Sequence, residues 1–496
     1  MDQVAVLKPG ASTEGATAGT DRVEPSDAEI PIAVDLDGTL IQTDSLTESV
    51  FVLVKHRPGS LLSVPLWFVR GRAGLKRQLA ANSLPEAATI PFNDALLAYL
   101  REQKQRGRRL VLATGADERV ARALVDPLEL FEEVFASDGS TNLTGERKRE
   151  RLVAAFGERG YDYAGNDARD LPVWRSARRA ILVSPSPRLA DAVRGVTELG
   201  PVFAAPRPTL ELWLTELRWH HWLKNLLVFV PLAAAHRLHE AWPLWQASLA
   251  FIGFCLAASS IYLVNDLIDL PVDRRHARKR ERPLAAGRIS VTHAIAMVPV
   301  LWLLATAIAM GLSASYFVVL AVYEVLMLAY GLRFKDLRFV DALLLGLGYT
   351  LRIVAGAVAV GVAVPAWLLL CSVPMFFGLA LLKRLAELTT ANTHGIVDGR
   401  ARAYGPGDKR RLAAVGAGAG FVAVAALAAY PLVEPAAQAG RGAVWVMSAL
   451  VALWLLRMWR LAARGAIRDD PVLFALRDPA SVAAGAAVLV LLVFAS

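Results

Sequence analysis

Hydrophobic and polar residues follow two different patterns in the two parts of the chain. From residue 30 to 205, short apolar runs alternate with charged stretches of helical length, whereas from residue 222 onward one long apolar run follows another. Alternating strands and helices are typical of an α/β domain with a mainly parallel sheet. Apolar runs of about 20 residues are long enough to cross a bilayer as helices. The pattern therefore predicts an α/β domain followed by an all-α membrane domain.

These patterns give specific boundaries. We expect a disordered tail at 1–29, the α/β domain at 30–205, a linker or interfacial helix at 206–221 and the membrane domain at 222–496. The candidate strands are Ile30–Val34, Arg109–Ala113, Glu133–Phe135, Tyr161–Ala164 and Ala180–Val183. Nine candidate spans follow at about residues 222–236, 244–264, 291–311, 314–331, 340–360, 366–382, 412–432, 442–458 and 479–495.

Composition and charge favour a multi-pass membrane protein. Of the 496 residues 55% are hydrophobic, and the formal net charge is +9. Basic residues gather in the loops after the second, fourth, sixth and eighth candidate spans, so the positive-inside rule places these loops and the α/β domain on the cytoplasmic side of the inner membrane. This arrangement accounts for the positive charge without a nucleic-acid partner. Both cysteines lie in apolar runs, which leaves no disulfide framework, and an oligomer is compatible with all of these features.

Two carboxylates follow the first candidate strand. Asp35 and Asp37 stand in the motif Asp-Leu-Asp-Gly-Thr-Leu, directly after the apolar residues 30–34. In a parallel sheet this position lies at the carboxyl edge, where ligands bind. The sequence therefore places a pair of acids at the ligand-binding edge of the α/β domain.

This motif resembles the first motif of the haloacid-dehalogenase superfamily, whose fold is Rossmann-like. The resemblance implies that Asp35 is the nucleophile that forms an aspartyl-phosphate and that Asp37 is the general acid and base of a phosphatase. Matches to the superfamily's other motifs occur in the expected order: the phosphate-binding Thr114, the charge-stabilising Lys148 and the acidic segment Asn166-Asp167-Ala-Arg-Asp170.

The acidic segment departs from the superfamily's usual pattern. Asn166 occupies the place of the usual first aspartate, and Asp167 comes one position later. We expect Asp170 and either Asn166 or Asp167 to hold Mg²⁺ together with Asp35 and Asp37. A degenerate domain that is retained as a scaffold is the alternative.

The long segment between the first two motifs has room for a helical cap. Residues 61–69 form an apolar run within it. We expect this run to be buried inside the cap, and contact with the membrane or with the second domain is the alternative.

The richest cluster of charge lies at the cytoplasmic end of the second candidate span. Asp266, Asp269 and Asp273 are spaced by three and four residues, so they line one face of a helix. Three such carboxylates repel one another without a counter-charge, and Mg²⁺ prefers a few carboxylates together with phosphate oxygens. The spacing predicts a Mg²⁺ site for a diphosphate, and a solvated loop of mixed charge is the alternative.

Together with Asn265, this segment resembles the first aspartate-rich motif of the UbiA superfamily of intramembrane prenyltransferases, Asn-Asp-x-x-Asp-x-x-x-Asp. Its continuation resembles a narrower branch, the decaprenyl-phosphate phosphoribosyltransferases, although Ala277 stands where that branch usually has proline. In the second aspartate-rich motif Asp341 is the matching residue and Asp336 is an extra acid, so the second metal shell is left open. The resemblance covers residues 218–496 and implies a UbiA-like helical fold.

Basic residues that match this branch come from several loops. A phosphoribosyl donor carries a 5-phosphate far from its diphosphate, so it needs more fixed cations than a prenyl diphosphate does. Arginine suits bidentate phosphate contacts and lysine supplies a point charge, whereas anchoring at the membrane surface is the alternative for each residue. The candidates are Arg278, Lys279, Arg282, Lys335, Arg352, Lys383 and Arg384. Lys224 joins them because a charge inside an apolar span is costly and typical of a functional site.

The resemblance implies an enzyme that transfers 5-phosphoribose from phosphoribosyl pyrophosphate to a polyprenyl phosphate among the membrane lipids, with Mg²⁺ on the leaving diphosphate. The soluble domain would then remove the 5-phosphate from the lipid product. One alternative is a UbiA-type prenyltransferase for an aromatic acceptor. Another is a phosphatase-like regulatory domain that is tethered to a membrane anchor.

Overall fold

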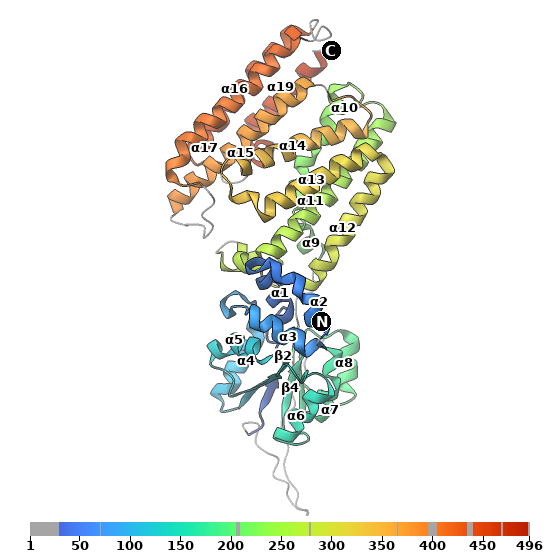
Figure 1. Ribbon diagram of the computed structural model, residues 1–496, viewed down its shortest axis with the longest axis vertical. Helices are drawn as coiled ribbons and strands as arrows, with labels where there is room; N and C mark the ends of the chain where they lie inside the picture. Colours follow the sequence, from blue (N-terminus) through green and yellow to red (C-terminus); the bar gives the residue numbers. More distant parts are fainter. Residues whose placement is uncertain are drawn as a thin grey trace, which may run out of the picture.

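The computed structural model describes residues 29–69, 71–204, 209–276, 279–364, 366–394, 404–433, 440–467 and 470–494. The tail expected at 1–29 lies outside these ranges except for Glu29, and Arg278 also lies outside them. Within them the chain forms an α/β domain and a helical domain, which follow each other along the longest axis of the molecule (Figure 1).

The α/β domain is built on a six-stranded, fully parallel sheet with the strand order β3-β2-β1-β4-β5-β6. The strands are β1 (Ile32–Val34), β2 (Leu110–Asp117), β3 (Glu133–Ser137), β4 (Asp162–Gly165), β5 (Arg179–Val183) and β6 (Glu198–Phe203). The first five confirm the predicted strands to within a few residues. β6 is missing from the prediction because Gly200 and Pro201 interrupt its apolar pattern, which the edge of a sheet tolerates.

Helices cover both faces of this sheet, because successive residues of a strand point to opposite sides. Ile32 and Val34 join a core with α4 (Asp94–Gln105) and α5 (Glu118–Val125). Ala33 points to the other face and joins a second core. The helices of that core are α6 (Glu146–Phe156), α7 (Leu171–Ser176) and α8 (Pro187–Arg194). With both faces buried, the loops at the carboxyl edge are left to form a pocket.

A helical cap is inserted between β1 and α4, as predicted. It consists of α1 (Ser45–His56), the 3₁₀ helix η1 (Pro58–Ser63), α2 (Val64–Val69) and α3 (Gly71–Asn82). The expected burial of the apolar run is wrong for Leu66, Phe68 and Val69, which are exposed. The reason is that the six-residue α2 contacts η1 and α3, which leaves its other side uncovered.

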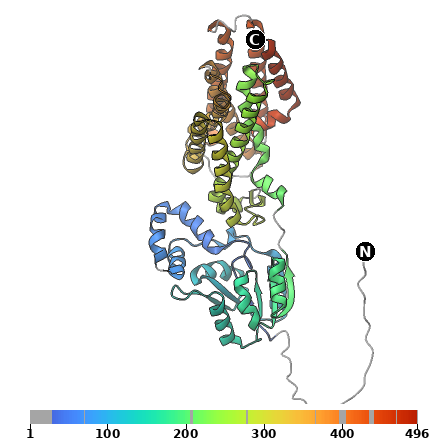
Figure 2. The same ribbon diagram turned by 90° about the vertical axis from the view of Figure 1, so that its right-hand side faces the viewer.

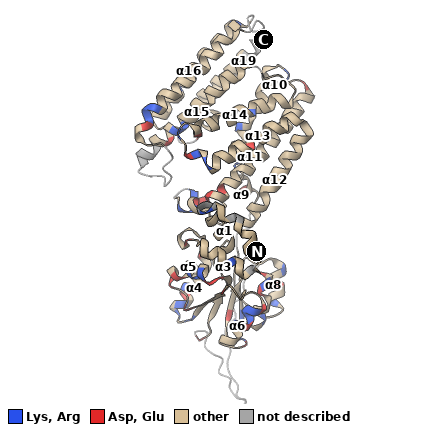
Figure 3. Cartoon of the chain, in the orientation of Figure 1, with Lys and Arg blue, Asp and Glu red and all other residues tan. Residues whose placement is uncertain are grey.

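The helical domain follows. Its elements are α9 (Leu210–Glu216), η5 (Trp219–Phe229), α10 (Val230–Ala234), α11 (Ala241–Arg275), η6 (Lys279–Glu281), α12 (Val291–Leu312), α13 (Ala314–Leu332), η7 (Phe334–Asp336), α14 (Val340–Ala359), α15 (Ala366–His394), η8 (Pro406–Asp408), α16 (Lys409–Val433), α17 (Arg441–Ala463), α18 (Pro471–Arg477) and α19 (Pro479–Phe494). Its Lys and Arg residues gather toward the end of the domain that faces the α/β domain, and the long helices carry few charges along their middle (Figure 3).

Nine spans are not confirmed. In the described residues, seven helices, α11 to α17, are long and apolar enough to cross a membrane, or eight spans result if the pair α18 and α19, bent by 86°, counts as one. The candidate span at 222–236 is instead a 3₁₀ helix followed by the five-residue α10. Pro231 interrupts it, and the buried polar residues Lys224 and Asn225 direct one side of η5 into the protein instead of the lipid.

The cap contacts the end of the helical domain at which α11 carries its acidic residues (Figures 1 and 2). Glu48 on α1 and Arg274 on α11 form an ion pair of 2.8 Å, with side chains only 2% and 5% exposed. Thr43 Oγ1 donates to the other carboxylate oxygen of Glu48 over 2.7 Å. Arg274 also donates to the carbonyl oxygens of Thr89 and Ala285. This network joins the two domains.

Replacement of Arg274 should loosen the contact between the domains. Arg274→Met leaves the buried Glu48 without its counter-charge, which typically costs about 3–5 kcal/mol. We expect faster hydrogen exchange in α1 of the full-length protein. Arg122→Met is the matched control, because Arg122 and Glu118 form an exposed pair on α5, and such pairs contribute about 0–1 kcal/mol. Equal exchange in α1 of both variants would contradict the role of this ion pair.

Candidate active sites

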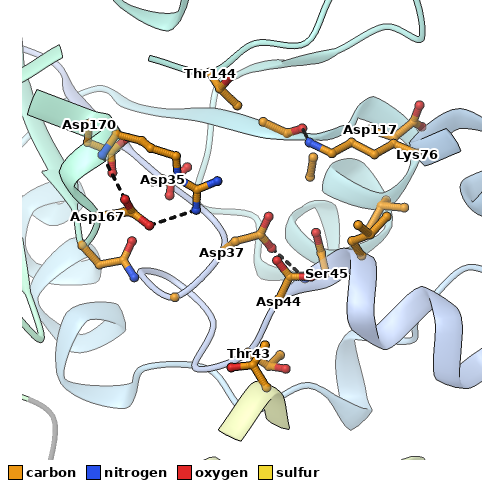
Figure 4. A pocket seen from close by; sticks show the side chains of 18 of the residues that line it. Asp35, Asp37, Thr43, Asp44, Ser45, Lys76, Asp117, Thr144, Asp167 and Asp170 are labelled. Atoms are coloured by element: carbon orange, nitrogen blue, oxygen red, sulfur yellow. Dashed lines mark hydrogen bonds and ion pairs between the residues drawn. The ribbon is translucent and has the colours of Figure 1, made fainter. Parts of the chain in front are cut away.

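The first site lies at the carboxyl edge of the parallel sheet (Figure 4). Asp35 and Asp37 follow β1, and Asp170 ends the short helix η4 (Ala168–Asp170) after β4. Asp37 Oδ1 accepts a hydrogen bond of 2.7 Å from the backbone N–H of Ser45, the first residue of α1. The neighbouring strands β1 and β4 thus bring the predicted acids together, and the cap approaches them from the other side.

Lys148 stands between two of these acids. It extends from α6, and its Nζ lies 2.8 Å from Asp35 Oδ1, 3.2 Å from Asp170 Oδ1 and 2.8 Å from the hydroxyl oxygen of Tyr163. Burial opposes its charge, but the two carboxylates outweigh this effect and raise its pKa. Lys148 therefore lies between Asp35 and Asp170, where its charge offsets theirs.

The pocket also fits a divalent cation. Burial raises the pKa of Asp35 to about 7 and that of Asp37 to about 6, so a positive charge here would favour both ionised forms. Asp170 Oδ2 is buried and has no hydrogen-bond partner. Asp170 lines the same pocket as Asp35 and Asp37, and carboxylate oxygens of this kind are the ligands that Mg²⁺ prefers.

The structure separates the two candidates for the remaining ligand. Asn166 lies against the loop of the first motif: Thr39 Oγ1 donates to its Oδ1 over 3.3 Å, and a side chain at Gly38, where φ is +72°, would collide with it. Asp167 is instead paired with Arg169, which follows it in the same turn. This placement favours Asn166 over Asp167 as the partner of Asp170.

Thr114 was expected to bind phosphate, but its side chain lies inside the domain. It is fully buried in β2, and its hydroxyl oxygen accepts a hydrogen bond of 3.0 Å from the N–H of Ala116. It does not line the pocket, whereas Gly115, Ala116 and Asp117, which follow it, do. Thr114 therefore shapes the end of β2, and the residues after it face the cavity.

The pocket has a volume of about 640 Å³ and reaches beyond the α/β domain. Lys76 of α3 lines it and donates to Asn142 Oδ1 over 3.0 Å. Ser290, Val291 and Thr292, at the beginning of α12, also line it. None of these was predicted from the sequence, because a single Lys on a cap helix or a Ser-x-Thr at a helix start carries no signal until the two domains meet.

The second site lies on the acidic face of α11. Asp266, Asp269 and Asp273 line a cavity of about 270 Å³, as their spacing predicts. Asn265 lines it too and lies so close to Gly331 of α13 that a Cβ at that glycine would collide with its side chain. The absence of a side chain at Gly331 therefore lets α11 and α13 approach each other beside the cavity.

Each of these carboxylates has a basic partner. Arg218 Nη2 donates to Asp266 over 2.6 Å and 2.8 Å. Arg282 Nη1 bridges Asp266 Oδ1 and Asp273 Oδ2 at 2.9 Å and 2.6 Å. Lys279 and Lys335 complete the set: Lys279 Nζ lies 3.7 Å from Asp273 Oδ1, and Lys335 Nζ lies 3.2 Å from Asp269 Oδ2. The aspartate face is thus neutralised by cations that arrive from other segments.

A second group of cations lines the same cavity. Lys224 and Lys383 share Asp470, with Nζ to Oδ2 distances of 2.8 Å and 3.1 Å. Arg352 is held by Asn225 Oδ1 at 2.6 Å and by the hydroxyl oxygen of Tyr323 at 3.0 Å. The structure therefore places these three predicted phosphate-binding residues around one cavity.

Two predicted site residues lie elsewhere. Asp341 Oδ2 accepts from Arg384 Nε over 2.6 Å, and its Oδ1 accepts from the hydroxyl of Tyr404 over 2.6 Å. Neither Asp341 nor Arg384 is among the described residues that line the cavity. This arrangement favours a structural role for the pair, which ties α14 to α15 and to Tyr404. The predicted Arg278 lies outside the described residues.

Two further charged residues line the cavity without having been predicted as site residues. They are Arg218, which precedes η5, and Asp470, which caps the N-terminus of α18. Both belong to the part of the chain that carries the family resemblance, which is the only signal that points to them. A lone charge in a loop has no periodic partner, so the sequence alone does not show which cavity it faces.

The chemistry of this aspartate face suits Mg²⁺, because carboxylate oxygens are its preferred protein ligands. In the described parts of the chain, however, no three His, Cys, Asp or Glu side chains are grouped closely enough to hold a metal ion as they stand. Asp266, Asp269 and Asp273 are instead held by Arg and Lys. A cation would therefore take over charge neutralisation that these basic residues now provide.

Both domains match known protein families. Residues 226–477 match the model of the UbiA prenyltransferase family. The chain belongs to this family. Residues 32–175 match the model of haloacid dehalogenase-like hydrolases, so the N-terminal domain of this UbiA family member is similar to that hydrolase family.

Similar proteins cover one or both domains. An uncharacterized protein of Sinorhizobium fredii is 37% identical over 472 residues, which is 93% of this chain and 90% of that protein. A decaprenyl-phosphate phosphoribosyltransferase of Mycolicibacterium smegmatis is 37% identical over 212 residues, which is 41% of this chain and 66% of that enzyme. A solved UbiA homologue from Archaeoglobus fulgidus is 19% identical, covers 57% of this chain and 97% of its own, and has a TM-score of 0.44.

Removal of the Lys148 charge should abolish hydrolysis in the phosphatase-type domain. Lys148→Met leaves Asp35 and Asp170 facing each other in a buried pocket, which disfavours a third, phosphate-borne negative charge. We expect the rate on a chromogenic aryl phosphate to fall by about 100-fold or more. Lys104→Met, at an exposed lysine on α4, is the control and should keep the wild-type rate. A Lys148→Met enzyme with near-normal turnover would contradict the assignment.

Proposed function

We propose that this protein transfers 5-phosphoribose from phosphoribosyl pyrophosphate to a polyprenyl phosphate and then removes the 5-phosphate from its lipid product. The observation that carries the proposal is the relation of the two sites. Both lie toward the same end of the helical domain, and the phosphatase pocket is walled by Ser290 and Thr292 at the start of the membrane helix α12. A phosphate carried on a membrane lipid is the substrate that such a pocket can reach.

The charge of the α11 cavity supports a donor that carries phosphates at two ends. Its described lining holds seven cations and four carboxylates. One group, Arg218, Lys279, Arg282 and Lys335, surrounds the aspartate face. The other group, Lys224, Arg352 and Lys383, is held by Asp470 and Asn225. A molecule with a diphosphate and a separate phosphate matches two such groups better than a prenyl diphosphate with a single charged end.

The residues that line the α11 cavity have definite parts in this reaction. Asp266, Asp269 and Asp273 would hold Mg²⁺, which supplies positive charge to the diphosphate leaving group. Arg218 and Arg282 pair with these carboxylates in the structure. Both can exchange these partners for oxygens of the bound diphosphate. A phosphate oxygen of the polyprenyl phosphate attacks the anomeric carbon, and the bond from that carbon to the diphosphate breaks. This oxygen is already an anion, so no general base is needed.

Hydrolysis in the α/β domain follows from the positions of its acids. Asp35 attacks phosphorus, and Asp37 donates a proton to the ribose oxygen that departs. Water then cleaves the aspartyl-phosphate while Asp37 takes up its proton. Lys148 balances the charge of Asp35 and Asp170 throughout. On α12 the lipid-facing residues Ile295 and Val300, which are exposed, begin just after Thr292, so a polyprenyl chain can remain in the bilayer while its head group occupies the pocket.

The two activities should be separable by mutation. Asp266→Asn and Asp269→Asn remove charge from the metal-binding face, so we expect loss of ribosyl transfer from labelled phosphoribosyl pyrophosphate with hydrolysis of an aryl phosphate unchanged. Asp336→Asn is the control, because that acid is exposed and does not line the cavity. Normal ribosyl transfer by either variant argues against the site. Transfer of a prenyl group to an aromatic acceptor, with no use of phosphoribosyl pyrophosphate, would replace the proposal.

The lipid products should reveal the substrate of the phosphatase-type domain. We expect wild-type protein to accumulate polyprenylphosphoryl ribose and Asp35→Asn to accumulate the 5-phosphate form at a similar total rate, as measured by mass spectrometry. Asp126→Asn, an exposed acid in the 3₁₀ helix after α5, serves as the control. If wild type and Asp35→Asn yield the same ratio of the two lipids, the domain acts on a different phosphomonoester or on none.

A further inference from the structure

The cap carries an apolar surface that none of the described residues covers. Leu66, Phe68 and Val69 of α2 are 70%, 61% and 84% exposed, and we refer to these three residues as the apolar edge of the cap. None of the residues of α2 is buried. Exposure of three large apolar side chains within one turn of helix to water is unfavourable. Such apolar patches mark contact sites.

The chain around the apolar edge has a one-sided charge. Residues 49–85 contain no Asp or Glu and six basic residues, namely Lys55, Arg57, Arg70, Arg72, Lys76 and Arg77. The rest of the α/β domain mixes both signs of charge (Figure 3). Apolar side chains flanked by Lys and Arg without acids are typical of segments that lie in the interface of an anionic bilayer.

The position of the cap brings this surface close to the lipid. The pair Glu48–Arg274 holds α1 against α11, and Phe51 of α1 packs in a cluster with Leu212 and Trp213 of α9. Figure 2 shows the cap helices projecting sideways from the α/β domain, near the level at which the helical domain begins. The bilayer that surrounds the spanning helices extends outward at this end of the helical domain, and the apolar edge is tied to the same end.

We propose that the apolar edge of the cap inserts into the interface of the anionic bilayer beside the helical domain. The apolar side chains lose contact with water, and the net positive charge of this segment attracts it to the anionic lipid surface. The exposure and charge of this surface support the membrane contact, whichever reaction either site catalyses. Its consequence is a phosphatase domain that is held at the membrane at two points, through Arg274 and through α2.

A fluorescent probe at position 68 tests the insertion directly. Full-length Phe68→Cys, in a background with Cys255→Ala and Cys371→Ala, is labelled with an environment-sensitive dye and placed in nanodiscs that contain lipids spin-labelled high on the acyl chain. Val300→Cys on the exposed face of α12 marks full lipid contact, and Glu158→Cys, exposed in the loop after α6, marks water. We expect quenching at position 68 close to that at Val300. Quenching no greater than at Glu158 overturns the proposal.

The lipid composition tests the role of charge. We expect quenching at position 68 to weaken when anionic phosphatidylglycerol is replaced by phosphatidylcholine, whereas quenching at Val300 stays constant. Equal quenching at position 68 in both lipids overturns the electrostatic part of the proposal. The triple variant Leu66→Glu, Phe68→Glu, Val69→Glu should keep wild-type hydrolysis of a water-soluble aryl phosphate, which shows that the cap is folded, and should lose activity on phosphomonoester lipids in vesicles. Unchanged activity on both substrates counts against membrane contact at α2.

Discussion

A buried ion pair between Glu48 and Arg274 determines how the two domains of this UbiA prenyltransferase meet. Arg274 directly follows Asp273 of the transferase cavity, and Glu48 lies in the first turn of α1. That helix begins with Ser45, whose N–H binds Asp37 of the phosphatase pocket. Separation of the pair would leave two charges buried without partners, which costs far more than loss of a surface pair. The orientation of the pocket toward α12 therefore depends on this contact.

Both sites solve the same electrostatic problem. Carboxylates are gathered in places with little water, where their charge is costly unless cations accompany them. In the α/β domain Lys148 serves two acids, and on α11 Arg282 bridges two more. These pairings hold the acids in position and also provide basic groups next to them. A substrate that brings phosphates together with a divalent cation can exchange partners with these pairs without leaving a charge uncompensated.

Several elements could be predicted because they depend only on neighbouring residues. The short run of apolar residues at 30–34 predicts a strand, and the spacing of Asp266, Asp269 and Asp273 places them on one face of α11 whatever surrounds the helix. The predictions that fail depend on distant parts of the chain. The candidate span at 222–236 has an apolar composition, but its polar residues meet Asp470, Cys255 and Arg352 inside the protein, and a 3₁₀ helix results. The expected burial of α2 is wrong for the opposite reason: its apolar residues Leu66 and Phe68 are exposed, because no element of the described chain covers them.

The sequence by itself determined the order of the domains, the strand after which the acids Asp35 and Asp37 stand, and the helix that carries the aspartate face. The tertiary structure alone decided which cation meets which acid. Lys224 and Lys383 share Asp470, whereas the neighbouring Arg384 turns to Asp341 outside the cavity. It also decided that Ser290 and Thr292 complete a pocket in the other domain. The physical reason is that an ion pair between distant segments depends on how helices pack, and local sequence patterns do not encode that packing.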